Sequence, residues 1–201
     1  YRRPHQAGAV DARTETLLDR ACPGSTVADW RADSPPHPLW GLVRSCQTGH
    51  ATDPEIRFAS SSGGAITALA LFALESGRVD AVIHIVADPD QPTGNITCLS
   101  RDRASLLAGA GSRYAPSSPL AHIRSLAATG ERYLFIGKPC DVSALRQLSQ
   151  LEPDVARAVP VMLSFFCAAV PSLAASRRIV DAMGLGEERL RSFRYRGHGW
   201  P

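Results

Sequence analysis

Two cysteines follow predicted apolar strands, where a thiol can act as a nucleophile or as a metal ligand. The first is Cys140, which ends the run Gly137-Lys138-Pro139-Cys140 directly after a strand predicted at residues 132–136. A thiol at the start of a helix lies in a positive field, which favours the thiolate that both kinds of chemistry require. The alternative is a buried structural cysteine in a tight turn.

The second is Cys167, which follows a strand predicted at residues 159–166 and precedes a helix that starts near a proline. If the two strands are parallel neighbours, Cys140 and Cys167 emerge side by side at one edge of the sheet. Thiolates placed in this way are candidate ligands of an iron–sulfur cluster, which usually takes four cysteines. The other three cysteines form no Cys-x-x-Cys pair that would complete such a set.

A run of small and hydroxylated residues, from Ser60 to Gly64, precedes a predicted helix. Small residues let the backbone approach a ligand closely, and the free N–H groups at a helix N-terminus bind anions. The run is therefore a candidate ligand-binding loop. A serine-glycine helix cap that binds no ligand is the alternative.

Several common sites are absent from the sequence. No G-x-G-x-x-G motif opens a strand–helix unit, so a dinucleotide site of the Rossmann type is not indicated. Lys138 is followed by proline instead of the Ser or Thr of a phosphate-binding P-loop, and the six histidines show no metal-ligand spacing. Ser61 and Ser62 lack the Gly-x-Ser-x-Gly elbow of a hydrolase.

The elements that must position these residues alternate between strands and helices. Near-continuous apolar runs predict three core strands covered on both faces, at residues 79–86, 132–136 and 159–166. Further strands are predicted at 40–47 and 95–99, and helices at 14–21, 65–76, 120–128, 141–148 and 173–183, with a turn or short helix at 53–55. The helix at 65–76 is apolar enough on all sides to be buried. The pattern predicts an α/β fold, with a mixed or largely parallel central sheet covered by helices and an irregular N-terminal extension.

The composition is that of an ordinary globular domain. The 201 residues are 44% hydrophobic and 20% charged, and no apolar run reaches the roughly 18 residues of a membrane helix, so we expect no membrane span. Five cysteines without a close pair favour a cytoplasmic protein over a disulfide framework. The net charge of +3 comes from scattered arginines with one short run at 189–196, a distribution that does not favour a nucleic-acid partner.

Short motifs along the chain together resemble the coenzyme F420 hydrogenase/dehydrogenase beta-subunit family. In chain order they are RFASSSGG (57–64), LESG (74–77), VDAV (79–82), GSRY (111–114), GKPC (137–140), ALR (144–146), FFC (165–167), YRG (195–197) and GWP (199–201). We expect an extension with a proline-rich connector at 1–38 and a flavin-binding domain at 39–201. The family's N-terminal half would cover 39–122 and its C-terminal half 130–201. Because the chain starts at Tyr1 instead of Met, we expect it to be truncated, and the motifs suggest the same at the other end.

The resemblance implies a subunit that contains FAD and passes electrons between iron–sulfur clusters and a hydride-accepting partner such as coenzyme F420. Its other partners would be redox subunits or a ferredoxin. Lys138 would be the catalytic residue near the electron-rich end of the flavin, and Cys140 and Cys167 would be two ligands of a 4Fe–4S cluster whose remaining ligands the sequence does not show. Three loops would surround the flavin: Ser61, Ser62, Gly63 and Gly64; Gly111, Ser112, Arg113 and Tyr114; and Gly137, Lys138 and Pro139.

Two other functions stay open from the residues alone. One is a thiol-dependent enzyme that uses Cys140 as its nucleophile and needs no flavin. The other is a truncated binding module without any cofactor. Colour separates them from the leading interpretation, because only a flavin or an iron–sulfur cluster absorbs visible light.

Overall fold

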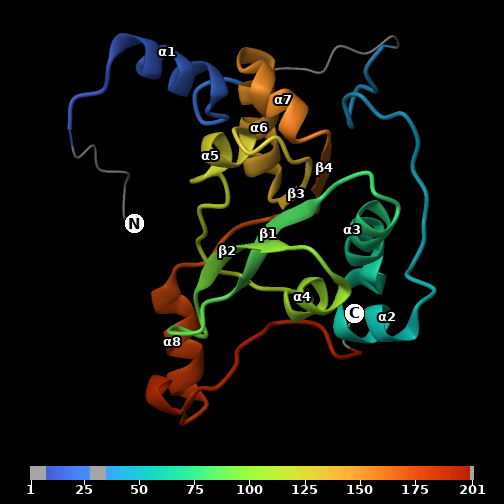
Figure 1. The fold of residues 1–201 in the computed structure, drawn as a ribbon. Coiled ribbons are helices and arrows are strands. Elements are labelled where there is room, and N and C mark those ends of the chain that lie inside the picture. The colour runs from blue at the N-terminus through green and yellow to red at the C-terminus, as the bar shows by residue number, and fades with distance from the viewer. Residues whose placement is uncertain (1–7, 28–34, 200–201) are drawn as a thin grey trace.

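The computed structural model describes residues 8–27 and 35–199 of the chain, and Figure 1 shows their arrangement. The strands are β1 (Ala81–Ala87), β2 (Asn95–Ser100), β3 (Tyr133–Gly137) and β4 (Val161–Ser164). The helices are α1 (Ala12–Ala21), α2 (Pro54–Ala59), α3 (Ala65–Glu75), α4 (Arg103–Ala108), α5 (Ile123–Ala127), α6 (Pro139–Leu151), α7 (Pro153–Ala158) and α8 (Leu173–Ala182), with short 3-10 turns η1 (Ser62–Gly64) and η2 (Glu187–Arg189).

The four strands form one sheet in the order β2-β1-β3-β4. β1 and β2 make an antiparallel hairpin, whereas β1 pairs with β3 and β3 pairs with β4 in parallel. The sheet is therefore mixed and mostly parallel, and the predicted α/β class is confirmed. Because parallel strands point the same way, the carboxyl ends of β1, β3 and β4 meet at one edge of the sheet.

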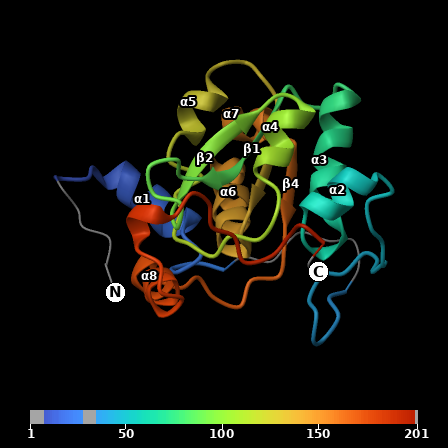
Figure 2. The same ribbon diagram turned by 90° about the horizontal axis from the view of Figure 1, so that it is seen from below.

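Two apolar cores cover the two faces of this sheet. Val82 of β1 and Leu134 of β3 pack with α3 and α4 on one face. Their neighbours Ile83, Tyr133 and Phe135 point to the other face and pack with α5, α6 and α7. Figures 1 and 2 show these helix groups on opposite sides of the sheet. Near-continuous apolar runs in β1 and β3 follow from burial on both faces.

Short polar residues begin several helices. Asp53 caps α2 by accepting hydrogen bonds from the backbone N–H groups of Glu55 and Ile56. Asp102 and Ser172 cap α4 and α8 in the same way. Each cap satisfies backbone donors that have no partner within the helix, so the chain direction changes at a defined residue.

The predicted elements agree with most of these helices and strands, but three expectations were wrong. Residues 40–47 form no strand, because they are largely exposed and their only bridge joins His37 to Gly41. The strand predicted at 159–166 is limited to β4, an edge strand, and Phe166 beyond it is fully exposed. Helix α3 is not buried on all sides, since Leu69 and Phe72 are 54% and 57% exposed. Helices α4 and α7 were not predicted.

The N-terminal helix α1 packs against α6, and its predicted position at 14–21 is confirmed. The buried amide of Gln147 in α6 donates to the backbone oxygens of Ala21 at 3.3 Å and Thr26 at 3.0 Å. Those bonds hold the segment after α1 on the body of the domain. Of the helices described within residues 8–27 and 35–199, none has the length and apolar character to cross a bilayer.

Truncating a core aromatic tests this arrangement. Phe135 is fully buried, and Gly137 lies directly against its ring. Glycine has no side chain that could move into the cavity left when the ring is removed. We expect Phe135→Ala to lower the free energy of unfolding by about 3–5 kcal/mol. Urea denaturation measures this change. The matched control is Phe166→Ala, which should change the same quantity by less than about 0.5 kcal/mol because Phe166 is exposed. Equal losses in the two variants would contradict the placement of β3 in the core.

Candidate functional site

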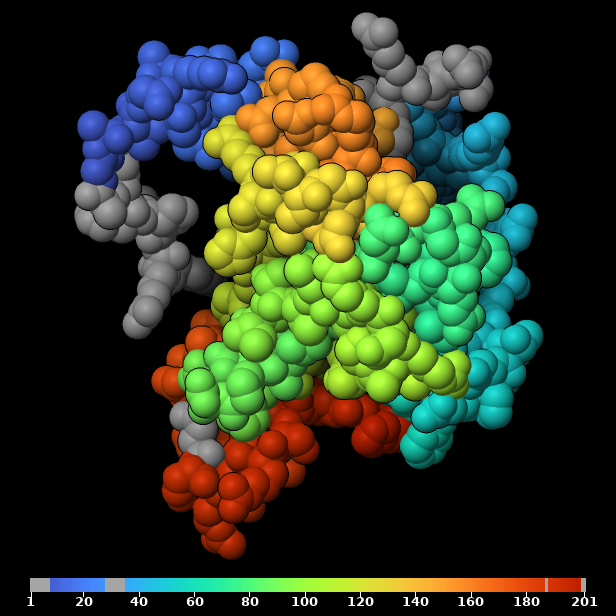
Figure 3. All heavy atoms as spheres, viewed as in Figure 1, coloured from blue at the N-terminus to red at the C-terminus, as the bar shows by residue number. Residues whose placement is uncertain are grey.

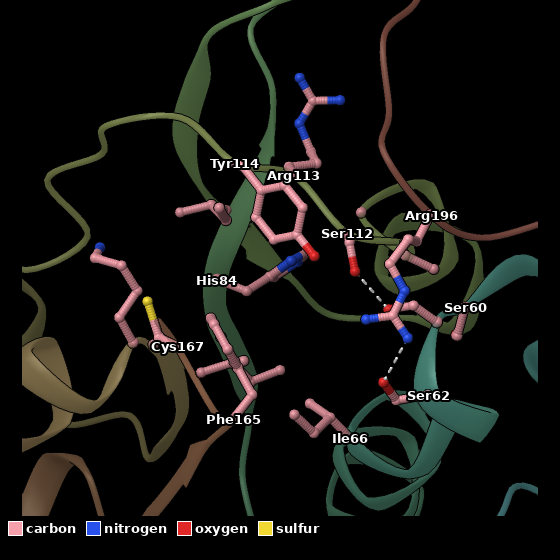
Figure 4. Close-up of a pocket in the computed structure, with 18 of the residues that line it drawn as sticks. Ser60, Ser62, Ile66, His84, Ser112, Arg113, Tyr114, Phe165, Cys167 and Arg196 are labelled. Atoms are coloured by element: carbon pink, nitrogen blue, oxygen red, sulfur yellow. Dashed lines mark hydrogen bonds between the residues drawn. The ribbon is translucent and has the colours of Figure 1, made fainter. Parts of the chain in front are cut away.

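A cavity of about 720 Å³ opens at the carboxyl edge of the parallel strands. Segments distant in sequence supply its walls: residues within 60–67, 84–85, 106–119, 136–138 with Asp141, 165–171, and Arg196. Figure 4 shows side chains from these stretches converging on one space. A volume of this size lies within the range of small-molecule and cofactor sites.

The serine-glycine loop forms one wall through an unusual backbone. Ser62, Gly63 and Gly64 have φ angles of 51°, 70° and 73°, so three consecutive residues lie in the left-handed region. A side chain on Gly64 would lie 3.1 Å from Ile56, and one on Gly63 would lie 3.0 Å from His50. Glycine is therefore required at both positions. Ser61, Ser62 and Gly64 line the cavity directly, whereas Gly63 supports the turn from behind.

The GSRY loop lies against the serine-glycine loop. The hydroxyl of Ser112 donates to the hydroxyl of Ser61 at 2.8 Å. Gly111, Ser112, Arg113 and Tyr114 all contribute to the wall of the cavity. Figure 4 shows the Tyr114 ring between Arg113 and His84. Two loops about 50 residues apart in sequence therefore share one site.

Arg113 fixes the GSRY loop by binding backbone oxygens from two other segments. Its Nη2 donates to the carbonyl oxygens of Pro92 at 2.7 Å and Gly94 at 2.9 Å, and its Nε donates to Asn95 Oδ1 at 2.7 Å. Its Nη1 donates to the carbonyl oxygen of Phe193. In Figure 4 the guanidinium extends away from Ser62 and Arg196. Arg113 thus joins the β1–β2 turn to the C-terminal segment.

The C-terminal segment, residues 193–199, closes the site like a strap. Ser112 N–H donates to the Arg196 carbonyl at 2.9 Å, and Tyr195 N–H donates to the Ser112 carbonyl at 3.0 Å. A side chain on Gly111 would lie only 2.8 Å from the Arg196 carbonyl oxygen, and one on Gly197 the same distance from that of Ala59. Both glycines permit this close approach of backbones.

Arg196 brings a cation from the strap into the cavity, and it was not among the predicted site residues. Its Nη2 donates to the Ser62 hydroxyl at 3.2 Å, as Figure 4 shows. The motif Tyr195-Arg196-Gly197 is part of the family resemblance, but nothing in the sequence placed it beside a loop more than 130 residues earlier. Ser61, Ser62, Ser112 and Arg196 together make this corner suited to an anionic group, because hydroxyls and guanidinium donate hydrogen bonds.

Lys138 also lines the cavity, as one half of an ion pair. Its Nζ lies 2.6 Å from Asp141 Oδ2 and donates to the Ser117 hydroxyl at 3.3 Å. Both charged side chains are 16% exposed, and Asp141 also lines the cavity. Asp141 was missed as a site residue, although it lies one helical turn from Lys138. The ammonium group is therefore held in a fixed position.

The two candidate metal ligands are placed differently. Gly137 and Cys167 line the cavity, whereas Pro139 and Cys140 begin α6 outside it, and both thiols are exposed. The expected parallel pairing is present: Gly137 pairs with Ser164, so each cysteine lies three residues beyond a paired position. Within residues 8–27 and 35–199, no three Cys, His, Asp or Glu side chains are grouped so as to hold a metal ion.

A buried histidine lies beneath the cavity. His84 of β1 is 5% exposed, and its Nε2 lies 2.7 Å from the hydroxyl of Ser100, which is completely buried. Burial lowers the pKa of His84, so the ring is neutral near pH 7. Gly109 makes room for it, because a side chain there would lie 2.5 Å from the ring. In the sequence, only its polar character within an apolar strand set His84 apart.

Two family models match this chain. One describes the N-terminal region of the coenzyme F420 hydrogenase/dehydrogenase beta subunit and matches residues 46–124. The other describes the C-terminal region of the same kind of subunit and matches residues 130–200. Together they cover most of the chain, including every loop that lines the cavity.

Individual relatives agree with this match. The chain is 28% identical over 130 residues to coenzyme F420 hydrogenase subunit beta of Methanosarcina barkeri, covering 64% of this chain and 44% of the relative. It is 32% identical over 88 residues to the chloroplastic 7-hydroxymethyl chlorophyll a reductase of Oryza sativa subsp. japonica, covering 43% and 19%. A solved structure of the F420-reducing NiFe hydrogenase complex from Methanosarcina barkeri superposes with a TM-score of 0.63 at 26% identity, over 73% of this chain and 52% of that one. The chain thus spans about half the length of its relatives, or less.

Replacing Arg113 tests its role in holding the strap. Lysine keeps the charge but presents a compact ammonium that cannot reach both the turn and the strap. We expect Arg113→Lys to lower the free energy of unfolding by about 2 kcal/mol, since hydrogen bonds to charged groups are lost. Hydrogen exchange should also become faster at the amides of Ser112 and Tyr195. Arg44→Lys, at an exposed site, is the control and should leave both quantities unchanged. Unaltered protection of the two amides in Arg113→Lys would rule out the proposed tie.

Proposed function

This chain belongs to the coenzyme F420 hydrogenase/dehydrogenase beta-subunit family, and from that premise we propose that it is the flavin-binding part of an oxidoreductase subunit. In this proposal the cavity holds FAD, and the whole protein passes electrons between iron–sulfur clusters and a hydride acceptor such as coenzyme F420. When bound, FAD supplies the electron and hydride chemistry, while the protein binds and orients it. A cytoplasmic location is part of the same proposal.

The single observation that carries the proposal is the cavity's pairing of an anion-binding corner with apolar walls. Arg196 and the hydroxyls of Ser61, Ser62 and Ser112 gather at one corner, next to the N-terminus of α3. The remaining walls include the apolar side chains of Ile66, Ile85, Tyr114 and Phe165. A dinucleotide with a charged pyrophosphate and a flat aromatic ring has these two needs. The residues present therefore fit FAD.

The chain's own residues would perform three tasks. Arg196 and the serine hydroxyls would hold the phosphate groups, aided by the free N–H groups at the start of α3. The walls formed by Ile66 and Phe165 would exclude water from the ring. Lys138, held by Asp141, would place a fixed positive charge beside the part of the ring that becomes electron-rich on reduction.

The thiols fit only part of a cluster site. Cys140 and Cys167 follow adjacent parallel strands at the same register, which supports our proposal that they are two ligands of a 4Fe–4S cluster. The described residues bring no third ligand to them, so the other thiols would come from elsewhere. For this reason we derive no catalytic role for a cluster from this part of the chain.

Removing the cation at the anion-binding corner tests the flavin proposal. Arg196→Ala should raise the Kd of FAD about tenfold or more, because a charge-assisted hydrogen bond of about 1.5–3 kcal/mol is lost. Quenching of FAD fluorescence during titration measures the affinity. Ser62→Ala should give a smaller loss, and Arg44→Ala should have no effect because Arg44 lies outside the cavity. If the parent protein binds no FAD, or if Arg196→Ala binds it equally well, the proposed function is wrong.

Iron content tests the role of the thiols. In protein purified without oxygen, Cys140→Ser and Cys167→Ser should each remove most of the iron and the brown absorbance, since each deletes a ligand. Cys22→Ser is the control, because this exposed thiol lies after α1. Retention of iron in Cys140→Ser would make Cys140 a structural thiol. Selective alkylation of Cys140 in iron-free protein would instead favour a thiol-dependent enzyme.

A further inference from the structure

The buried histidine of β1 is not used by the three tasks proposed above. His84 is 5% exposed and lies in an apolar strand between Ile83 and Ile85. Because side chains alternate along a strand, its ring shares the face of Val82, which α3 and α4 cover. Figure 3 shows atoms of β2 and α4, coloured yellow-green, packed closely over this region. A polar ring in this position costs free energy of desolvation that Val or Ile would not cost.

The ring of His84 lies beside the anion-binding corner of the cavity. His84 lines the cavity together with Gly109 and Ser112. A side chain at Gly109 would lie 2.5 Å from the ring, so the backbone passes directly over the imidazole three residues before Ser112. In Figure 4 the ring points from β1 toward Ser112 and the hydroxyl end of Tyr114. A charge on this ring would therefore act on a ligand held at the corner.

Hydrogen-bond partners for a protonated ring are already in place. Nε2 of His84 lies 2.7 Å from the hydroxyl of Ser100, which is completely buried. A hydroxyl can donate to a neutral imidazole nitrogen and can accept from the N–H of an imidazolium. Burial lowers the pKa of His84, and the backbone of Ile85 opposes this by a smaller amount. The ring is thus neutral near pH 7 because a negative charge is missing, although an acceptor is present.

The ring faces apolar residues on its own side of the sheet and ionisable residues in the cavity. Leu71 of α3, Leu106 of α4 and Leu134 of β3 belong to the core on that side. Cys98 of β2 lies directly opposite His84 in the antiparallel pair. The other ionisable side chains that line the cavity are Arg113, Tyr114, Lys138, Asp141, Cys167 and Arg196. Since Asp141 is paired with Lys138, the described residues of the cavity offer an imidazolium no carboxylate of its own.

The charge of the proposed ligand calls for a second cation at the corner. The pyrophosphate of FAD carries two negative charges near pH 7, whereas Arg196 supplies one positive charge there. The charge of Lys138 is balanced by Asp141. The guanidinium of Arg113 donates to backbone oxygens of other segments and extends away from Arg196 in Figure 4. A proton on His84 would supply the second positive charge, because a nearby anion favours the charged form of a buried base.

From these observations we propose that His84 takes up a proton when the cavity binds a pyrophosphate diester, and that this proton strengthens the binding. The proposal rests on the proposed function and deepens it by assigning a further binding residue and a dependence on pH. The proton comes from the buffer and adds to the lone pair of an imidazole nitrogen, at most one per bound ligand, without any transfer of electrons. Ligand and proton then raise the affinity for each other by the same factor.

The dependence on pH has a defined sign. The bound anion raises the pKa of His84 above its value in the free protein. Above both pKa values the ring is neutral in both states, and below both it is protonated in both, so the Kd is constant in each of these ranges. Between the two values the Kd falls as the pH falls, by at most about tenfold per pH unit for one proton. Because burial lowers the pKa of the free ring, this window begins below the ordinary histidine value of about 6.5.

Calorimetry measures the proton directly. FAD and ADP-ribose would each be titrated into the protein at about pH 6 in two buffers of different ionisation enthalpy. ADP-ribose has the same pyrophosphate diester without the flavin ring, and this diester stays doubly charged between about pH 6 and pH 8. We expect uptake of about 0.5–1 proton per ligand at about pH 6. The Kd should be at least about fivefold lower at about pH 6 than at about pH 8.

Two variants separate His84 from the other histidines. His84→Gln keeps a side chain that can bond to Ser100 but cannot be protonated. It should take up no proton, and its Kd should differ less than about twofold between the two pH values. His122→Gln is the matched control, because His122 is exposed and lies outside the cavity, and it should keep the full pH dependence. If His84→Gln does not fold, NMR titration of the histidine rings in the parent protein decides, since the pKa of His84 should be higher with ADP-ribose than without it.

The remaining outcomes keep the two proposals apart. Binding of FAD without proton uptake, or with equal uptake in His84→Gln, would leave the flavin site standing and reject the role of His84. Proton-linked binding of ADP-ribose by a protein that binds no FAD would keep the role of His84 and reject the flavin site. Binding of neither ligand would overturn both. A pKa of His84 that does not move on ligand binding would make it a histidine of the core alone.

Discussion

Parallel pairing of β1, β3 and β4 is the constraint on which the candidate site depends. Because these strands point the same way, the loops that follow β3 and β4 emerge together and bring Lys138 and Cys167 to one edge. The pairing itself depends on burial of both faces, which removes the apolar side chains of β1 and β3 from water. A slip of one residue would exchange the two cores, so burial also fixes the register that aligns Cys140 with Cys167.

Close approach of backbones then closes the other half of the cavity. Gly64, Gly111 and Gly197 lie where a side chain would come within about 3 Å of neighbouring atoms, so the loops meet main chain to main chain. Contacts of this kind leave little conformational freedom, and Arg113 adds hydrogen bonds that tie the turn, the loop and the strap together. The hydroxyls of Ser61 and Ser112 are thereby held in position before any ligand arrives, which reduces the entropy lost on binding.

The sequence predicted which residues form helices and strands better than it predicted what those residues contact in the folded chain. Apolar runs located β1 and β3, and helix stops located most helices, because burial and capping act over a few neighbouring residues. The prediction of a strand at 40–47 was wrong because a strand also needs a neighbouring strand to pair with, and the local residue pattern does not reveal one. In the site, short motifs identified the serine-glycine, GSRY and GKPC loops. Arg196, Asp141 and His84 were missed, since their roles depend on contacts that only the folded chain creates.

The distribution of charge separates two tasks in this molecule. Inside the cavity, Lys138 is paired with Asp141, so its charge is held in place and largely balanced when no ligand is present. At the surface, Arg101, Arg124 and Arg132 are paired with carboxylates in exposed ion pairs, which add little stability. At the serine-glycine loop, by contrast, the guanidinium of Arg196 donates to the hydroxyl of Ser62, so a cation meets hydroxyl groups there, which is an arrangement that suits an anionic ligand.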